Sequence, residues 1–293
     1  MKKYPLYIFF LLLFNSFVFT QDVNFFGNYG QIITLKSSYS MFPHQKRFDG
    51  HVYKDKKYSF EEHYNDSTVK VFIPSYFKNS NKVDVVIHFH GWWNNIDSVI
   101  KQFKLIEQFY ESKKNAILIF PEGPKNSPDS FGGKLEENDV FKKLVYDILN
   151  QLKNKKYIKN NKIGNIIISG HSGAYRVISY ILQKGGIRDK IKEIYLFDAL
   201  YGNTEKYIFW LLKSNGKLIN IYTNDGGTKE ESEKLLEACI DWKIKAKFIE
   251  EENLNLKDLL SNRIIFIHSK LDHNQVLFQN KNFYQYIKSS CLK

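Results

Sequence analysis

The sequence Gly170-His171-Ser172-Gly173-Ala174 lies between an apolar run at 163–169 and a segment with helical spacing. This order predicts a buried strand, a tight turn of small residues and then a helix. A serine at such a turn presents its hydroxyl beyond the sheet edge, and the amides that begin the helix favour a developing negative charge. Ser172 is therefore the candidate nucleophile, and the alternative is that its hydroxyl only caps the helix.

Short apolar runs alternate with amphipathic segments over most of the chain. Runs without polar alternation are typical of parallel strands that are covered on both faces. The pattern predicts a mostly parallel, doubly wound α/β sheet flanked by helices, and no composition shift divides residues 21–293 into two domains. The predicted strands are 31–38, 69–74, 83–90, 116–120, 163–169, 194–198, 218–223, 246–250 and 264–268, and the predicted helices are 97–112, 138–152, 173–184, 204–213, 228–240 and 276–287.

The carboxyl ends of these strands carry the residues that matter for chemistry, as open parallel sheets require. An early strand ends in His90-Gly91-Trp92, the next relevant turn is 170–174, and acids and histidines follow later in the chain. With these motifs the chain resembles the α/β-hydrolase superfamily, in its serine esterase and lipase-like form, from about residue 69 onward. The order serine, acid, histidine is the one that this family uses. The resemblance implies an acyl-transfer hydrolase that needs no cofactor and no metal, and it leaves the substrate open because this fold hosts many activities.

The general base must be a histidine that follows Ser172, and only His268 and His273 do. His268 ends an apolar strand, where a histidine is often buried and merely hydrogen-bonded. His273 lies in the next loop, from which a side chain reaches back over the sheet edge. We predict His273 as the base and keep His268 as the alternative.

The acid that orients this histidine is predicted to be Asp198, with Asp225 as the alternative. Asp225 follows the strand that most often carries the acid in this family, but Asn224-Asp225-Gly226-Gly227 is also an ordinary turn sequence. Asp198 stands in the apolar segment 197–200, and a carboxylate buried there needs a partner.

Two backbone amides are predicted to hold the oxyanion of the tetrahedral intermediate. One is the amide of Gly173, which follows the nucleophile, and the resemblance supplies the amide of Trp92 as the other. Gly91 allows the chain to turn so that this amide points inward. Trp92 and Trp93 either line the substrate pocket or pack as ordinary aromatic residues.

Metal and disulfide chemistry have weak signals in this chain. His88 and His90 share one face of a strand, which permits a metal site, but no acidic or cysteine ligand follows at suitable spacing, and we predict none. The only cysteines, Cys239 and Cys291, allow either one disulfide or two free thiols.

The first residues have the pattern of a secretory signal peptide. Two lysines precede an apolar run at 4–19 that is shorter than the ~20 residues of a membrane span. We predict a signal peptide over 1–20 and export to the periplasm or the medium, with an uncleaved membrane anchor as the alternative. The net charge of +12 comes from scattered lysines, so we expect no nucleic-acid binding and at most weak attraction to anionic surfaces.

These observations predict an exported serine hydrolase, most readily one that cleaves carboxylic esters of small molecules or polymers. An amidase or peptidase with the same triad is the enzymatic alternative. Ala174 stands where the family's nucleophile motif usually has a second glycine, and this departure leaves room for a non-catalytic binding protein on the same fold. The sequence does not determine the oligomeric state.

Overall fold

The structure of the protein is a computed structural model that describes residues 23–293. The predicted signal peptide at 1–20 lies outside these residues, so export stays a prediction. Within the described part of the chain, no helix is both long and apolar enough to cross a membrane.

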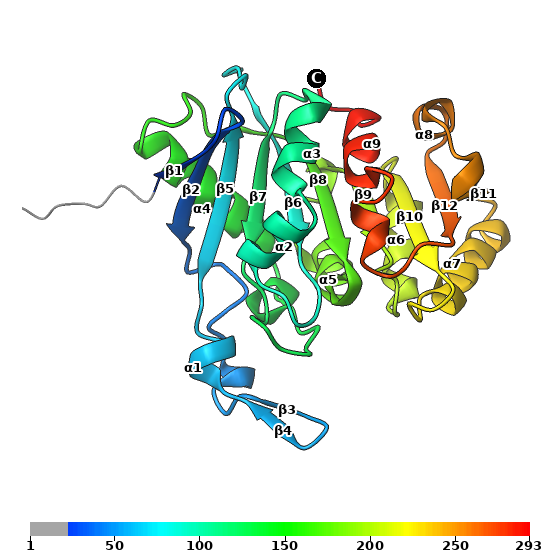
Figure 1. Cartoon of the computed structure of the whole chain (residues 1–293), viewed down its shortest axis with the longest axis horizontal. Helices are drawn as coiled ribbons and strands as arrows, with labels where there is room; N and C mark the ends of the chain where they lie inside the picture. Colours follow the sequence, from blue (N-terminus) through cyan, green and yellow to red (C-terminus); the bar gives the residue numbers. More distant parts are fainter. Residues whose placement is uncertain (1–22) are drawn as a thin grey trace, which may run out of the picture.

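Ten strands form one sheet in the order β1-β2-β5-β7-β6-β8-β9-β10-β12-β11 (Figure 1). From β7 to β11 in this order all neighbours are parallel, whereas β1, β2 and β5 are joined to the sheet by antiparallel pairing. The predicted α/β class is therefore confirmed. The strands are β1 (Val23–Phe26), β2 (Gly30–Lys36), β5 (Thr68–Pro74), β6 (Val83–Phe89), β7 (Ile117–Pro121), β8 (Ile163–His171), β9 (Ile191–Phe197), β10 (Lys217–Thr223), β11 (Lys247–Glu250) and β12 (Ile264–Ser269).

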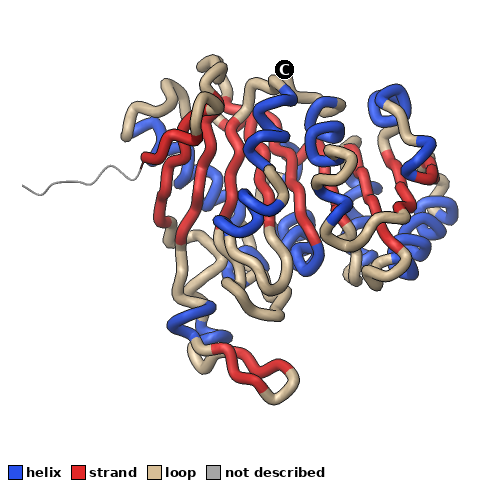
Figure 2. The backbone as a smooth tube through the Cα atoms, in the orientation of Figure 1, coloured by secondary structure: helices blue, strands red, loops and turns tan. Residues whose placement is uncertain are grey.

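Helices cover both faces of the sheet, which is why its strands are apolar on both sides (Figure 2). Phe141 and Trp210 belong to the core on one face, and Phe109 and Phe283 belong to the core on the other. The first face is covered by α4 (Val140–Asn154), α5 (Tyr175–Lys184), α6 (Thr204–Lys213) and α7 (Lys229–Asp241), and the second by α2 (Ile96–Gln102), α3 (Leu105–Ser112), α8 (Leu256–Ser261) and α9 (Asn282–Lys288).

The single helix predicted over 97–112 is wrong, because α2 and α3 are separate helices. Lys104 between them has a left-handed backbone with φ of 50°. Gln108 satisfies the broken end, since its side-chain amide donates to the carbonyl of Phe103 at 2.8 Å. Likewise the closing helix predicted over 276–287 is a short turn at Gln275–Leu277 followed by α9.

A small hairpin between β2 and β5 had no signal in the sequence. It consists of β3 (His51–Tyr53) and β4 (Lys56–Tyr58), and α1 (Phe60–His63) follows it. Its two turn residues, Lys54 and Asp55, both have positive φ, at 45° and 63°. A two-residue turn of this kind normally contains asparagine or glycine, so its sequence did not reveal it. The hairpin projects away from the main sheet (Figure 1).

Both cysteines are free thiols. Cys239 is buried in α7, whereas Cys291 is exposed near the C-terminus. Of the two alternatives that the sequence left open, the structure therefore shows unpaired cysteines.

Candidate active site

The turn at Ser172 joins the end of β8 to α5. Ser172 has a left-handed backbone with φ of 55°, which is uncommon for a residue other than glycine and concentrates at functional sites. A Cβ atom on Gly170 would lie 2.8 Å from the methyl carbon of Ala174, and one on Gly91 would lie 2.5 Å from Cβ of Ser172. Ala174 is thus accommodated because Gly170 has no side chain. The close packing confines the backbone of the turn.

The side chains of Asp198 and His273 meet beside this turn. Asp198 follows β9 and is fully buried, whereas the imidazole of His273 is about one-third exposed. Asp198 Oδ2 lies 2.6 Å from Nδ1 of His273. A carboxylate at this nitrogen holds the proton on Nδ1 and leaves Nε2 to act on a neighbouring hydroxyl.

Asp198 is held by a loop that follows β10. Its carboxylate accepts hydrogen bonds from the amide of Thr223 at 3.0 Å, from the Thr223 hydroxyl at 2.8 Å and from the Thr228 hydroxyl. Gly226 lies so close to the carboxylate that no side chain fits there. Burial alone would raise the pKa of Asp198, but the hydrogen bonds from His273, Thr228 and Thr223 outweigh it, and the pKa lies below its usual value. Asp198 is therefore ionised at neutral pH.

His171 connects the turn at Ser172 to the loop that carries His273. Its ring lies 4.5 Å from the ring of His273, measured between centroids, and its Nε2 donates to the backbone carbonyl of His273 at 3.0 Å. Burial and the neighbouring His273 lower the pKa of His171 to about 3, so His171 is neutral. A neutral ring adds no positive charge next to His273. The residue before Ser172 thus positions the loop that carries the candidate base.

The loop after β6 lies directly against Ser172. The indole of Trp92 covers Gly173, since a Cβ on Gly173 would lie 2.5 Å from Cδ1 of Trp92. The indole N–H donates to the hydroxyl of Ser130 at 2.7 Å. Among the described residues, the backbone amide of Trp92 has no hydrogen-bond acceptor. Both amides predicted for the oxyanion, those of Trp92 and Gly173, therefore belong to segments in contact with each other.

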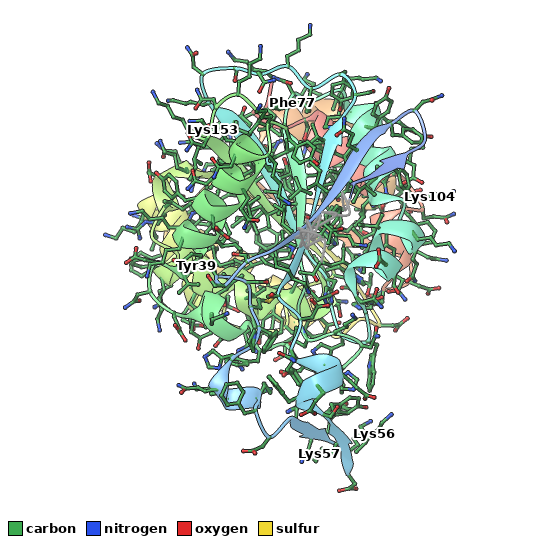
Figure 3. The ribbon with its side chains drawn as sticks, turned by 90° about the vertical axis from the view of Figure 1, so that its left-hand side faces the viewer. Tyr39, Lys56, Lys57, Phe77, Lys104 and Lys153 are labelled. Carbon is green, nitrogen blue, oxygen red and sulfur yellow. The ribbon has the colours of Figure 1, made fainter. Side chains whose placement is uncertain are left out.

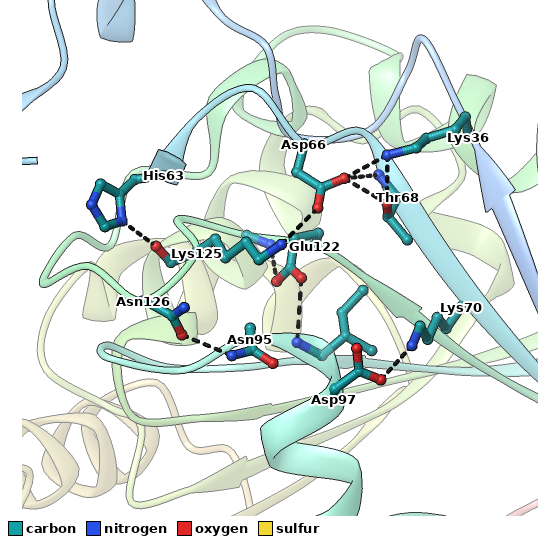
Figure 4. Close-up of polar contacts among 12 residues, drawn as sticks. Lys36, His63, Asp66, Thr68, Lys70, Asn95, Asp97, Glu122, Lys125 and Asn126 are labelled. Carbon is teal, nitrogen blue, oxygen red and sulfur yellow. Dashed lines mark hydrogen bonds and ion pairs between the residues drawn. The ribbon is translucent and has the colours of Figure 1, made fainter. Parts of the chain in front are cut away.

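The buried pair of His90 and Glu122 holds the loop that follows β6. His90 Nδ1 donates to the carbonyl of Gly91 at 2.8 Å, and His90 Nε2 lies 2.8 Å from Oε1 of Glu122. Glu122, labelled in Figure 4, also accepts a hydrogen bond from the amide of Ile96 at 3.4 Å. Burial would lower the pKa of His90, but Glu122 outweighs it and the pKa is raised. Since the carbonyl of Gly91 and the amide of Trp92 belong to one trans peptide, holding the first directs the second the opposite way.

We expect Glu122→Gln to lower the free energy of unfolding by about 3 kcal/mol, because buried His90 loses the carboxylate that raises its pKa. A raised pKa stabilises the fold below the unfolded value of about 6.5, and this contribution is lost as pH rises through the folded pKa of His90. In denaturant unfolding, the difference in the free energy of unfolding between the native protein and Glu122→Gln should therefore become smaller above the folded pKa of His90. Glu137→Gln is the matched control, since Glu137 is 54% exposed and meets His44 at 3.1 Å. A pH-independent difference contradicts the interpretation.

The alternative residues have other surroundings. His268 contacts Glu250 through Nδ1 at 2.8 Å and Asn224 through Nε2 at 2.9 Å, so both ring nitrogens already have partners. Asp225 is exposed in the loop after β10. The structure therefore brings Asp198 and His273 together and leaves His268 and Asp225 out of that contact.

His88 and His90 are both buried, but they have different partners. His88 Nδ1 meets the hydroxyl of Ser169 at 2.8 Å, and burial together with nearby histidines lowers its pKa to about 3. His90 belongs to the pair with Glu122. Among the described residues, no three side chains of His, Cys, Asp or Glu gather as a metal site would require.

Several residues of the site had no signal in the sequence. Thr223 ends β10 and Thr228 precedes α7, and neither residue type indicates that its hydroxyl contacts Asp198. Ser130 lies in a loop recognised only by composition, yet it accepts from Trp92. Tyr201 lies 6.4 Å from the ring of His273 and donates its hydroxyl to the carbonyl of Gly226. These contacts join loops that are far apart in the chain.

Comparisons with known proteins identify the fold. No family model matches the chain, and no curated protein matches it in sequence. Among solved structures, a mutant of the feruloyl esterase module from Clostridium thermocellum complexed with sinapinate is 10% identical, with a TM-score of 0.55 over 90% of this chain and 88% of that chain. A ferulic acid esterase is 12% identical, with a TM-score of 0.52 over 87% and 98%. The fluorophosphonate-binding serine hydrolase F of Staphylococcus aureus, substrate bound, is 11% identical, with a TM-score of 0.52 over 88% and 98%. The chain has the α/β-hydrolase fold.

Proposed function

We propose that the protein is a serine hydrolase and that its substrates are carboxylic esters. The observation that carries the proposal is the 2.6 Å contact between Asp198 and His273, next to a serine with a left-handed backbone. A buried carboxylate, a histidine and a serine at a strand–helix turn are the groups that acyl transfer through a covalent intermediate requires.

In the proposed mechanism, Nε2 of His273 takes the proton of Ser172 Oγ while this oxygen attacks the carbonyl carbon of the ester. The resulting oxyanion accepts hydrogen bonds from the amides of Trp92 and Gly173. The intermediate collapses, the alcohol leaves with the proton from His273, and the acyl group stays on Ser172. Water then attacks the acyl carbon while His273 takes one of its protons. The second tetrahedral intermediate collapses, the bond to Ser172 Oγ breaks, His273 returns the proton to this oxygen, and the acid leaves.

Asp198 acts on this sequence only through His273. Its negative charge stabilises the imidazolium that forms when Ser172 loses its proton, and its position selects the proton on Nδ1. The hydrogen bonds from Thr223 and Thr228 keep Asp198 ionised in a buried place, where an unpaired carboxylate would be too costly.

Asp198→Asn should lower kcat about 10⁴-fold, because an amide donates where the carboxylate accepts and so favours the wrong tautomer of His273. Asp225→Asn is the matched control and should leave kcat within about twofold, since Asp225 is exposed. Steady-state kinetics with a 4-nitrophenyl ester, together with thermal unfolding of both variants, measure these effects. A large loss of kcat in Asp225→Asn and none in Asp198→Asn would assign the acid to Asp225.

The choice of esters over amides is tested by a matched pair, 4-nitrophenyl acetate and 4-nitroacetanilide. The alcohol of an ester is a better leaving group than the amine of an amide, so its departure depends less on protonation by a general acid. We expect turnover of the ester that exceeds the rate in buffer and in Ser172→Ala protein, with little turnover of the anilide. Faster hydrolysis of the anilide would favour an amidase or peptidase, and turnover of neither, with no covalent labelling of Ser172, would favour a binding protein.

A further inference from the structure

The hairpin of β3 and β4, which we call the aromatic arm (residues 51–58), projects beyond the edge of the sheet at which β8 ends (Figure 1). Ser172 directly follows β8, so the arm and the candidate nucleophile lie at the same edge. Figure 3 shows Lys56 and Lys57 on the arm, outside the main body of the molecule.

A continuous series of aromatic contacts joins the arm to the nucleophile turn. The indole of Trp92 lies against Gly173, the residue after Ser172. The ring of Tyr53 on the arm lies 5.4 Å from the ring of Trp92 and 6.4 Å from that of Trp93, in both cases edge to face. Tyr58, also on the arm, lies 5.6 Å from Trp93. Such edge-to-face pairs stabilise beyond their buried area, which holds the arm against this loop.

Two features of Trp93 cost free energy in the folded protein. Its side chain is 53% exposed, and its backbone is left-handed with φ of 60°. The amide of Trp93 donates to the carbonyl of Ser127 at 3.1 Å, so the surrounding loop enforces this conformation. An exposed indole on a strained backbone beside a candidate active site is an arrangement that binding accounts for better than folding does.

Among the contacting rings of Tyr53, Tyr58, Trp92 and Trp93, the indole of Trp93 has the face that is open to solvent. Lysines already lie over the two tyrosines of the arm, with Lys54 Nζ 5.5 Å from the centroid of Tyr53 and Lys56 Nζ 5.3 Å from that of Tyr58. In the described part of the chain no such cation lies over Trp93. An indole that is flanked by tyrosines and open to solvent presents a flat apolar surface.

We propose that the open indole face of Trp93, which Tyr53 and Tyr58 hold in place, forms a binding surface for a flat ring in the ester substrate, located outside the reacting carbonyl group. The proposal rests on the proposed hydrolase function of Ser172. A ring that packs on the indole buries apolar area on both partners and gains the favourable geometry of aromatic contacts. An aromatic ring and the apolar face of a sugar ring share this chemistry.

Trp93→Ala tests the surface through substrate selectivity. We compare benzyl acetate, with a ring in the alcohol, and methyl phenylacetate, with a ring in the acyl group, with ethyl acetate, which has none. The variant should lose about tenfold in kcat/KM for a ring-bearing ester, chiefly through KM because the ring is bound before and during reaction, with ethyl acetate unchanged within about twofold. Trp242→Ala removes a different indole that is 61% exposed and should change none of these values. Equal losses on all three esters, or no loss on the ring-bearing ones, overturn the proposal.

A binding measurement on Ser172→Ala protein separates this proposal from the proposed catalysis. The chain has four tryptophans, whose indole N–H signals are resolved by NMR and assigned by substitution. Benzyl alcohol and methyl glucoside supply an aromatic and a sugar ring, and ethanol is the control without a ring. We expect the Trp93 signal to shift with at least one ring compound while the Trp242 signal stays in place. If Trp93 responds but the native chain takes no fluorophosphonate, the hydrolase proposal alone fails; if Ser172 is labelled but Trp93 ignores both rings, the arm proposal alone fails.

Discussion

Replacing Ser172 by alanine should lower ester turnover by about a million-fold, to the rate that the remaining oxyanion donors support. The change removes one oxygen atom and keeps Cβ, so the left-handed backbone at φ of 55° is equally strained in both proteins. We therefore expect thermal unfolding to change little. A loss of this size without loss of the fold is what removing a nucleophile predicts, and a helix-capping hydroxyl predicts a small loss of stability instead.

The matched control for this variant is Ser179→Ala in the helix that follows the turn. Ser179 is buried, donates its hydroxyl to the carbonyl of Arg176 at 2.7 Å and accepts from Asn203 at 2.8 Å. Its loss should cost about 1 kcal/mol of stability and little turnover. Single-turnover kinetics and calorimetry on both variants separate the two roles. Turnover by Ser172→Ala near the native rate excludes Ser172 as the nucleophile.

His273→Ala should lower kcat nearly as much, by about 10⁵-fold to 10⁶-fold, because it removes the proposed base that takes the proton of Ser172. The substitution also removes one of the hydrogen bonds that keep the pKa of Asp198 low. The imidazole of His273 is about one-third exposed, so its removal leaves a site that a small molecule can enter. Added imidazole should therefore restore part of the activity of His273→Ala and none of that of Ser172→Ala.

His268→Ala is the comparison that identifies the base. His268 has partners in Glu250 and Asn224, so its loss should weaken the packing of β12 against β11 and leave kcat within a few-fold. If His268→Ala is inactive and His273→Ala is active, the assignment of the base is wrong. Activity in both single variants would mean that neither histidine is the base.

The fold could be predicted largely from apolar runs, because parallel strands that are covered on both faces need them. Breaks inside a helical pattern could not, since the amphipathic spacing of 97–112 continues across Lys104 while the tertiary contacts of Gln108 stabilise a break. The hairpin at 51–58 could not be predicted, because Lys54 and Asp55 adopt positive φ although its turn lacks the asparagine or glycine that normally indicates one.

For the candidate site, the sequence indicates the candidate reactive residues, but it gives no signal for the residues that contact them. Ser172, Asp198 and His273 stand at strand ends, and parallel topology brings such ends to one edge. The burial expected of Asp198 from its apolar neighbours implied a partner, and the structure provides His273, Thr223 and Thr228. These threonines could not be predicted, because their hydroxyls matter only through the path of the loop after β10. The same holds for Glu122, which pairs with His90 across two neighbouring strands.

The most direct measurement of the central claim is reaction with a fluorophosphonate, which forms a covalent bond only with an activated serine. The native chain is treated with the probe, digested, and the modified peptide is located by mass spectrometry. The account predicts one stoichiometric adduct on Ser172 that is absent from Ser172→Ala and strongly slowed in His273→Ala and Asp198→Asn, while Ser179→Ala reacts at the native rate. An unmodified native chain, or an adduct that persists in Ser172→Ala, would contradict the assignment of Ser172 as the nucleophile.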